Sequence, residues 1–231
     1  MTSDFSDLDA PALVSAELRR QGVNAIGYGP PVGYERYVRI LHPMNSGDDV
    51  DEAMMTWRTV AQMGSIDIGA RTTWADVMAG IDARTARQPW FAFDLEPVPS
   101  TLPRAQCAAL LRRLASVSTS SRCIFGTWDG YADLDRGVAS APHVDVVGRT
   151  TCVFVRPISV DVPDTTDRES PLRRFRAPNL WLAADRQWLV TTELYSLDTI
   201  LAGTTSVIAA VKAESRLEVV DVDHSDLKFV S

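Results

Sequence analysis

The sequence predicts an α+β fold, with a mainly antiparallel β-sheet and several packed helices in a single domain. Segments rich in β-forming residues gather in the second half of the chain, without the regular strand–helix alternation of a parallel sheet. No internal repeat occurs, and no stretch is long enough to link two separate domains. Hydrophobic residues make up 45% of the 231 residues, which is enough to build one core without disulfides or metals.

The beginning of the chain is expected to hold a tail, a helix and a strand. Residues 1–9 are predicted to be a flexible tail, so that the α+β domain spans residues 10–231. Apolar residues at helical spacing predict a helix after Ala10, with Gly22 as its end. After a Gly/Pro-rich loop, the β-branched and aromatic residues of 34–43 predict a strand that ends at a proline.

The next segments are expected to be mainly helical. Within 45–65, apolar residues share one helical face, and a second short helix within 72–82 has Thr73 as its N-cap. Residues 86–104 contain several prolines and are predicted to form a loop around one short strand. The clearest helix lies within 103–118 and buries a face made of Cys107, Leu110, Leu111 and Leu114.

The second half of the chain is expected to consist of short strands joined by turns. Residues 163–178 are predicted to be a polar loop bounded by prolines. Thr204 or Thr205 is expected to cap a helix within 203–215. Strands are predicted within 122–128, 143–147, 150–160, 179–183, 187–195 and 216–223.

Charge and cysteine content limit the class of partner and the compartment. The chain has 23 Lys and Arg against 30 Asp and Glu, a net charge of −7 and an isoelectric point of about 5.0. Nucleic acid is not expected as a partner because its binding depends on neutralising phosphates, whereas a basic protein partner is favoured. The N-terminus lacks the basic and apolar regions of a signal peptide, and no membrane-spanning segment is expected. Three cysteines cannot all form disulfides with one another, which favours a reducing compartment. The sequence therefore predicts a cytoplasmic protein with no membrane partner.

Three sequence blocks carry a resemblance to a known family. They are PPVGYERYVRILHP near the start, CIFGTWDG in the middle, and PNLWLAADRQWLVTTELYSLDTILAGTTSVIAAV toward the end. Together they resemble a family of uncharacterised actinobacterial cytosolic proteins, over roughly residues 30–222. The family has Trp-Pro where this chain has Leu182 and Ala183, and Gly-Gly-Ser within the region of ILAGT. The resemblance implies a shared fold and no assigned activity.

The first candidate site is the segment that holds Trp181, Asp185, Arg186, Trp188 and Glu193. If the two tryptophans flank a turn on adjacent antiparallel strands, they share one face of the sheet. That face, rimmed by the charged residues, would suit a peptide or a flat ligand. The alternative is a hairpin whose tryptophans fill the core while the aspartate and arginine pair in the turn.

The second candidate site is Trp128-Asp129-Gly130. A strand that ends in Asp-Gly predicts a tight turn above all. The functional alternative makes Asp129 an acid or base near Glu193, since two carboxylates within reach of each other can perform hydrolytic chemistry.

No metal or nucleotide cofactor is expected. His42, His143 and His224 are far apart in the sequence and share no ligand spacing. Cys152 with His143 could suggest a thiol nucleophile, but neither lies in a known motif, and the cysteines are interpreted as small core residues. The basic cluster LRRFR, residues 172–176, is interpreted as part of a solvated loop rather than as a grip for an anionic partner.

The sequence therefore favours a non-catalytic binding or interaction protein. One concrete form is an immunity-like protein that masks a basic partner, because acidic inhibitors of basic enzymes use electrostatic steering. The alternative is an enzyme or small-ligand binder with a carboxylate and arginine site near Trp128, Asp185 and Glu193. An accessory subunit without a small-molecule site is a third hypothesis. The sequence predicts no oligomeric state.

Overall fold

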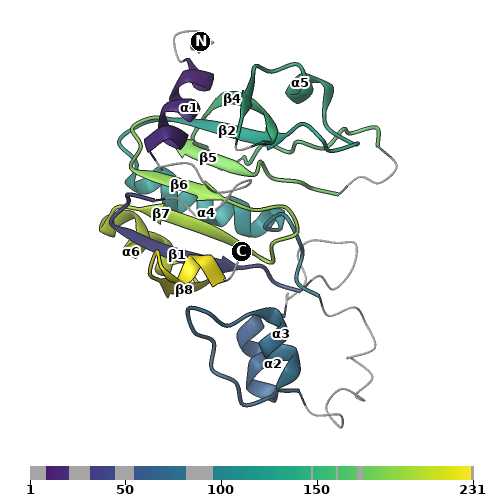
Figure 1. Cartoon of the computed structure of the whole chain (residues 1–231), viewed down its shortest axis with the longest axis vertical. Helices are drawn as coiled ribbons and strands as arrows, with labels where there is room; N and C mark the ends of the chain where they lie inside the picture. Colours follow the sequence, from purple (N-terminus) through teal and green to yellow (C-terminus); the bar gives the residue numbers. More distant parts are fainter. Residues whose placement is uncertain are drawn as a thin grey trace.

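Eight strands form one sheet in the computed structural model, and each strand runs antiparallel to its neighbours (Figure 1). Their order across the sheet is β3-β4-β2-β5-β6-β7-β1-β8. The structure describes residues 9–20, 32–44, 55–81, 96–146, 148–159, 161–170 and 174–229. This architecture confirms the predicted α+β class with a mainly antiparallel sheet.

The strands are β1 (Arg36–Leu41), β2 (Arg122–Trp128), β3 (His143–Asp145), β4 (Thr150–Pro157), β5 (Leu180–Ala183), β6 (Trp188–Thr191), β7 (Asp198–Gly203) and β8 (Glu218–Val222). The helices are α1 (Ala10–Arg20), α2 (Trp57–Met63), α3 (Trp74–Ala79), α4 (Arg104–Val117), α5 (Arg136–Ala139), α6 (Thr205–Lys212) and the 3-10 helix η3 (Asp226–Phe229). Among the helices of the described ranges, none is both long and apolar enough to cross a membrane.

Helices cover both faces of the sheet (Figure 1). The long helix α4 packs beside α6 on one face, and their apolar residues join strand residues in the largest core cluster. α1 packs against the other face over β3 and β4, where its Val14 meets the side chains of β2, β4 and β5. Side chains of β1 point alternately to the two faces of the sheet. Val38 and Ile40 point into the α4–α6 core, whereas Arg39 between them points to the opposite face.

The short helices α2 and α3 lie beyond the β8 edge of the sheet (Figure 1). Their tryptophans, Trp57 and Trp74, meet edge to face with ring centroids 5.2 Å apart. Thr73 caps α3 as predicted, and it forms a capping box with Asp76. The carboxylate of Glu218 in β8 accepts hydrogen bonds from the first two backbone N–H groups of α2, at 2.8 Å each. These bonds attach the α2–α3 pair to the sheet.

The structure differs from the sequence prediction in several elements. β7 and α5 have no counterpart among the predicted elements. The strand predicted within 187–195 ends at Thr191, because the following residues leave the sheet to form a loop. Three expectations fall wholly or largely outside the described residues, namely the tail at 1–9, the Gly/Pro-rich loop before residue 34 and the short strand within 86–104.

Candidate functional site

The two tryptophans of the β5–β6 hairpin belong to the core. Trp181 and Trp188 share the α4–α6 face of the sheet and are 2% and 0% exposed. The indole N–H of Trp181 donates to the carbonyl of Pro178 at 2.8 Å, and that of Trp188 donates to the hydroxyl of Ser118 at 2.7 Å. Both polar atoms are therefore satisfied inside the protein, and neither ring can contact a partner at the surface.

The turn between β5 and β6 holds the next two predicted residues. The carboxylate of Asp185 accepts hydrogen bonds from the Thr119 hydroxyl at 2.5 Å and from the Ser120 backbone N–H at 2.8 Å. Asp185 thus joins the turn to the loop after α4 and does not pair with Arg186 in the way that the core-hairpin alternative supposes. Arg186 occupies the left-handed region at φ 60° and lines a shallow hollow of about 330 Å³.

Asp185 lies at the opposite end of the strands from Trp128 and Glu193. β6 separates Asp185 from Glu193, and its four residues alone span about 13 Å at about 3.3 Å per residue. The structure therefore does not assemble a carboxylate and arginine site from Trp128, Asp185 and Glu193.

Trp128, Asp129 and Gly130 form the predicted turn at the end of β2. The Trp128 ring lies 5.2 Å from the ring of Tyr131, edge to face. A Cβ atom on Gly130 would fall 2.2 Å from the Trp128 ring, which explains the glycine at this position. Asp129 is exposed and lies toward β4, where its charge adds to burial in raising the pKa of the Cys152 thiol. Nothing in this placement supports Asp129 and Glu193 as a catalytic pair.

Tyr131 is the centre of an ionic and aromatic cluster beside this turn. The guanidinium of Arg176 stacks 3.9 Å from its ring centroid and pairs with Asp133, with 2.5 Å between Nη1 and Oδ1. The side-chain amide of Asn179 donates to the Tyr131 hydroxyl at 3.1 Å, and burial raises the pKa of that hydroxyl. These contacts give the partly buried Tyr131 side chain a structural role.

Glu193 follows β6 at the same end of the strands as this turn, close enough for its charge to act on Tyr131. Its carboxylate pairs with Arg149 and accepts a hydrogen bond from the backbone N–H of Leu194 at 2.6 Å. These contacts fix the start of the loop between β6 and β7.

That loop presents Tyr195 to the solvent. The Tyr195 side chain is 82% exposed, and its backbone occupies the left-handed region at φ 66°. Ser100 has the same unusual backbone, with φ 67°. The Ser100 hydroxyl accepts from the Tyr195 N–H at 2.9 Å, and the Ser100 N–H donates to the Ser196 carbonyl at 2.8 Å. Left-handed backbone costs a non-glycine residue about 1–3 kcal/mol, so these bonds hold two strained residues in place, and such strain concentrates at functional sites.

A pocket of about 310 Å³ lies beneath Tyr195. Its walls include Trp57 and Trp74, and its polar residues include Arg39 and Asp198. The Arg39 Nε atom lies 2.7 Å from Asp198 Oδ2, and both residues are almost fully buried. Arg39 Nη1 also donates to the carbonyls of residues 70 and 72, at 3.0 Å each. This network gives the pocket a rigid polar floor between aromatic walls.

The loops around Tyr195 are strongly acidic. Hydrogen bonds connect segments 96–101, 129–135, 161–169, 174–179 and 193–198 into one surface, which we call the Tyr195 surface. Together with the arginines outside them that pair with their carboxylates, Arg39, Arg104 and Arg149, these segments hold ten Asp and Glu and six Arg, whereas the rest of the chain holds 20 Asp and Glu and 17 Lys and Arg. The Tyr195 surface therefore carries a net charge of −4, which is more than half of the −7 of the whole chain.

Sequence reasoning finds part of this surface. It singles out Asp129 and Glu193, which lie there, and Trp128, which directly precedes the surface at the end of β2; it also singles out Trp181 and Trp188, which are core. It misses Tyr195, because no local pattern signals the exposure of one aromatic residue in a loop. It equally misses Ser100, whose role depends on a contact between distant segments.

No family model matches the chain, and neither curated proteins nor solved structures gave a significant match. The resemblance to the actinobacterial family is thus not tested by these comparisons and stays a prediction. The candidate site rests on the geometry described above.

Proposed function

We propose that the protein is a non-catalytic binding protein that recognises a basic protein partner through the Tyr195 surface. The observation that carries this proposal is the exposed Tyr195, held by Ser100 in a strained loop above an aromatic pocket. Tyrosine is enriched among the residues that dominate binding energy. Because hydrogen bonds already fix the backbone of this loop, the loop loses little backbone freedom when a partner covers Tyr195.

The ion pairs of the surface favour binding over catalysis. A general acid or base needs access to substrate and a pKa suited to proton transfer. The carboxylates of Asp133, Glu193 and Asp198 are each paired with an arginine. Such pairs hold the loops in place and occupy the carboxylates, which suits a stable recognition surface.

The acidity of the Tyr195 surface favours a basic partner. Complementary charge raises the rate of association and excludes partners of like charge, while aromatic contacts slow dissociation. An immunity-like protein that masks a basic toxin would use a surface of this kind. Cys107, Cys123 and Cys152 are free thiols in the structure, which fits the proposed cytoplasmic location.

Affinity capture from a lysate of the native host tests the proposal. The wild-type protein should retain one near-stoichiometric basic partner at low salt and lose it at high salt. Tyr195→Ala should lose the partner at low salt. Met63→Ala is the matched control, since Met63 in α2 is another exposed large apolar residue, and it should retain the partner. A partner that both variants retain equally would contradict the assignment of the surface.

A further inference from the structure

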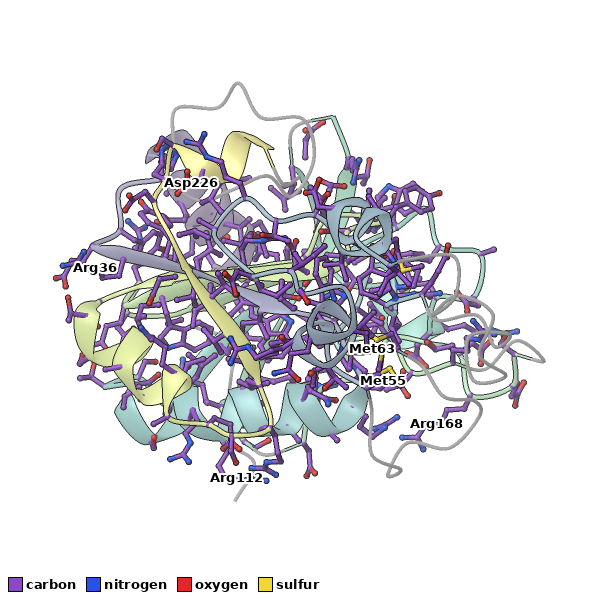
Figure 2. All side chains as sticks on the ribbon, turned by 90° about the horizontal axis from the view of Figure 1, so that it is seen from below. Arg36, Met55, Met63, Arg112, Arg168 and Asp226 are labelled. Atoms are coloured by element: carbon purple, nitrogen blue, oxygen red, sulfur yellow. The ribbon has the colours of Figure 1, made fainter. Side chains whose placement is uncertain are left out.

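A second surface lies at the β8 edge of the sheet, away from Tyr195. Among the described strands, β8 pairs with β1 alone. The start of β8 is covered, because Glu218 binds the N-terminus of α2 and Val220 packs in the cluster of α2 and α3. At the end of β8, no described strand pairs with its outer side and the side chain of Asp221 is 66% exposed, whereas Val222 is 7% exposed and packs against Leu227 of η3. Figure 2 looks toward this edge, with Arg36 and Asp226 on either side of the end of β8.

A groove of about 740 Å³ opens beside this end of β8. It is lined by the first residues of β1, by the outer face of α6, by the last residues of β8 and by the start of η3. Tyr37 and His224 meet there with ring centroids 5.7 Å apart, and Ile208 of α6 adds an apolar wall. The groove therefore offers apolar and aromatic contact beside a strand edge.

Carboxylates outnumber bases in this groove. Glu35, Asp221, Asp223 and Asp226 line it together with two bases, Arg36 and Lys212. Lys212 pairs with Asp221 across the surface, and Asp226 pairs with Arg71 at 2.7 Å, outside the lining residues. Asp223 follows the last residue of β8, and its backbone N–H donates to the Asp226 carboxylate at 3.1 Å, so that the carboxylates of Asp221 and Asp223 both lie at this end of the strand.

We propose that the open end of β8 binds an extended basic segment of a partner protein by strand addition. The backbone of the segment would continue the sheet, and its lysine or arginine side chains would meet Asp221 and Asp223. A second copy of this chain is a poorer occupant, because it would bring the same carboxylates close together, and charged residues on an edge strand oppose such pairing. This site lies at the opposite end of the strands from Tyr195, and its test is independent of the function proposed above.

The test is NMR titration of the isotope-labelled full chain with synthetic peptides. The probe is a short peptide in which lysine alternates with threonine. One control peptide carries N-methyl groups on successive residues, which keeps the charge but prevents strand pairing. A second control replaces lysine with glutamate. We expect the first peptide to shift the amide signals of residues 219–223 and of the start of β1, and neither control to do so.

Two variants sharpen the test. Replacing both carboxylates, Asp221→Asn with Asp223→Asn, should weaken binding of the lysine peptide about threefold or more, since exposed ion pairs each contribute modestly. Asp167→Asn on the Tyr195 surface should leave that affinity unchanged. Three results would each refute strand addition. They are equal binding of the N-methylated peptide, amide shifts confined to residues outside β8 and β1, and no amide shifts at millimolar peptide. Protection of β8 amides through a dimer of the chain itself would also refute it.

Discussion

The loss of stability on acidification provides a quantitative test of the buried His42 and its hydrogen bonds. His42 at the end of β1 is 0% exposed, and both of its ring nitrogens have partners. Nδ1 lies 2.6 Å from the Val98 carbonyl, which can only accept, so Nδ1 carries the hydrogen. Nε2 lies 2.9 Å from the Thr199 hydroxyl, which in turn contacts the Thr192 hydroxyl at 2.8 Å. This arrangement suits the neutral imidazole, in which Nε2 accepts a hydrogen bond from the Thr199 hydroxyl.

Burial lowers the pKa of His42 from 6.5 to about 4, although the Val98 carbonyl and the charge of Asp198 oppose the change. The folded protein therefore binds a proton on His42 less readily than the unfolded chain does. The resulting stability is complete above pH 6.5 and is lost as the pH falls toward about 4. At about 1.4 kcal/mol for each pH unit, the loss is about 3 kcal/mol. That is a large share of the 5–15 kcal/mol that is typical of a folded domain.

The assay is urea unfolding at pH 7 and at pH 4.5, for the wild type and for His42→Gln. Other titrating groups act equally in both proteins, so the difference between them reports His42 alone. The wild type should lose about 2.5 kcal/mol more than the variant between these two pH values. NMR titration of the His42 ring should show no protonation above about pH 5. If both proteins lost the same free energy of unfolding between the two pH values, or if the His42 ring were protonated near pH 6.5, burial would not be the cause of the predicted pH dependence.

Three further substitutions should destabilise the fold, each measured by urea unfolding. Gly130→Ala places a methyl group against the Trp128 ring and should cost about 1–3 kcal/mol. Asp198→Asn leaves Arg39 buried without its charge partner and should cost about 3–5 kcal/mol, and a loss below 1 kcal/mol would show that the pair is solvated. Hydrogen bonds from arginine lower the pKa of Glu214 from 4.5 to about 2, so Glu214→Gln should lower stability at pH 7. Because the wild-type advantage fades as the pH falls from 4.5 toward 2, a difference that persists at pH 2 would contradict this cause.

Elements with strong local signals could be predicted from the sequence. The apolar spacing within 103–118 places Cys107, Leu110, Leu111 and Leu114 on one face of α4, and all four are fully buried. Thr73 and Thr204 cap their helices as predicted, because an N-cap needs only a side-chain oxygen beside the first turn. These features depend on residues a few positions apart.

Features that depend on distant residues could not be predicted in this way. β7 is buried on both faces along its whole length, so it lacks the alternation that marks a half-buried strand. The order of strands depends on pairing between segments far apart in the chain, as in the pairing of β1 with β7. Spacing alone also could not tell whether Trp181 and Trp188 face solvent or helices.

The candidate site shows the same limit. The backbone of Tyr195 is held by Ser100, which lies 95 residues earlier in the chain. The pocket beneath Tyr195 joins α2 and α3 to the loop before β7, and the buried pair of Arg39 and Asp198 joins β1 to β7. Composition did indicate an acidic protein, but only the fold shows that the acidity gathers around Tyr195.

The most direct test of the account is the affinity of the captured, purified partner for three proteins. Isothermal titration calorimetry would compare the wild type, Tyr195→Ala and the control Met63→Ala at low and at high salt. The account predicts that Tyr195→Ala weakens binding about 30-fold, as expected for loss of a residue that contributes about 2 kcal/mol. It predicts that Met63→Ala binds like the wild type and that salt weakens binding of all three. Equal affinities of Tyr195→Ala and the wild type, or binding unaffected by salt, would contradict recognition of a basic partner by the Tyr195 surface.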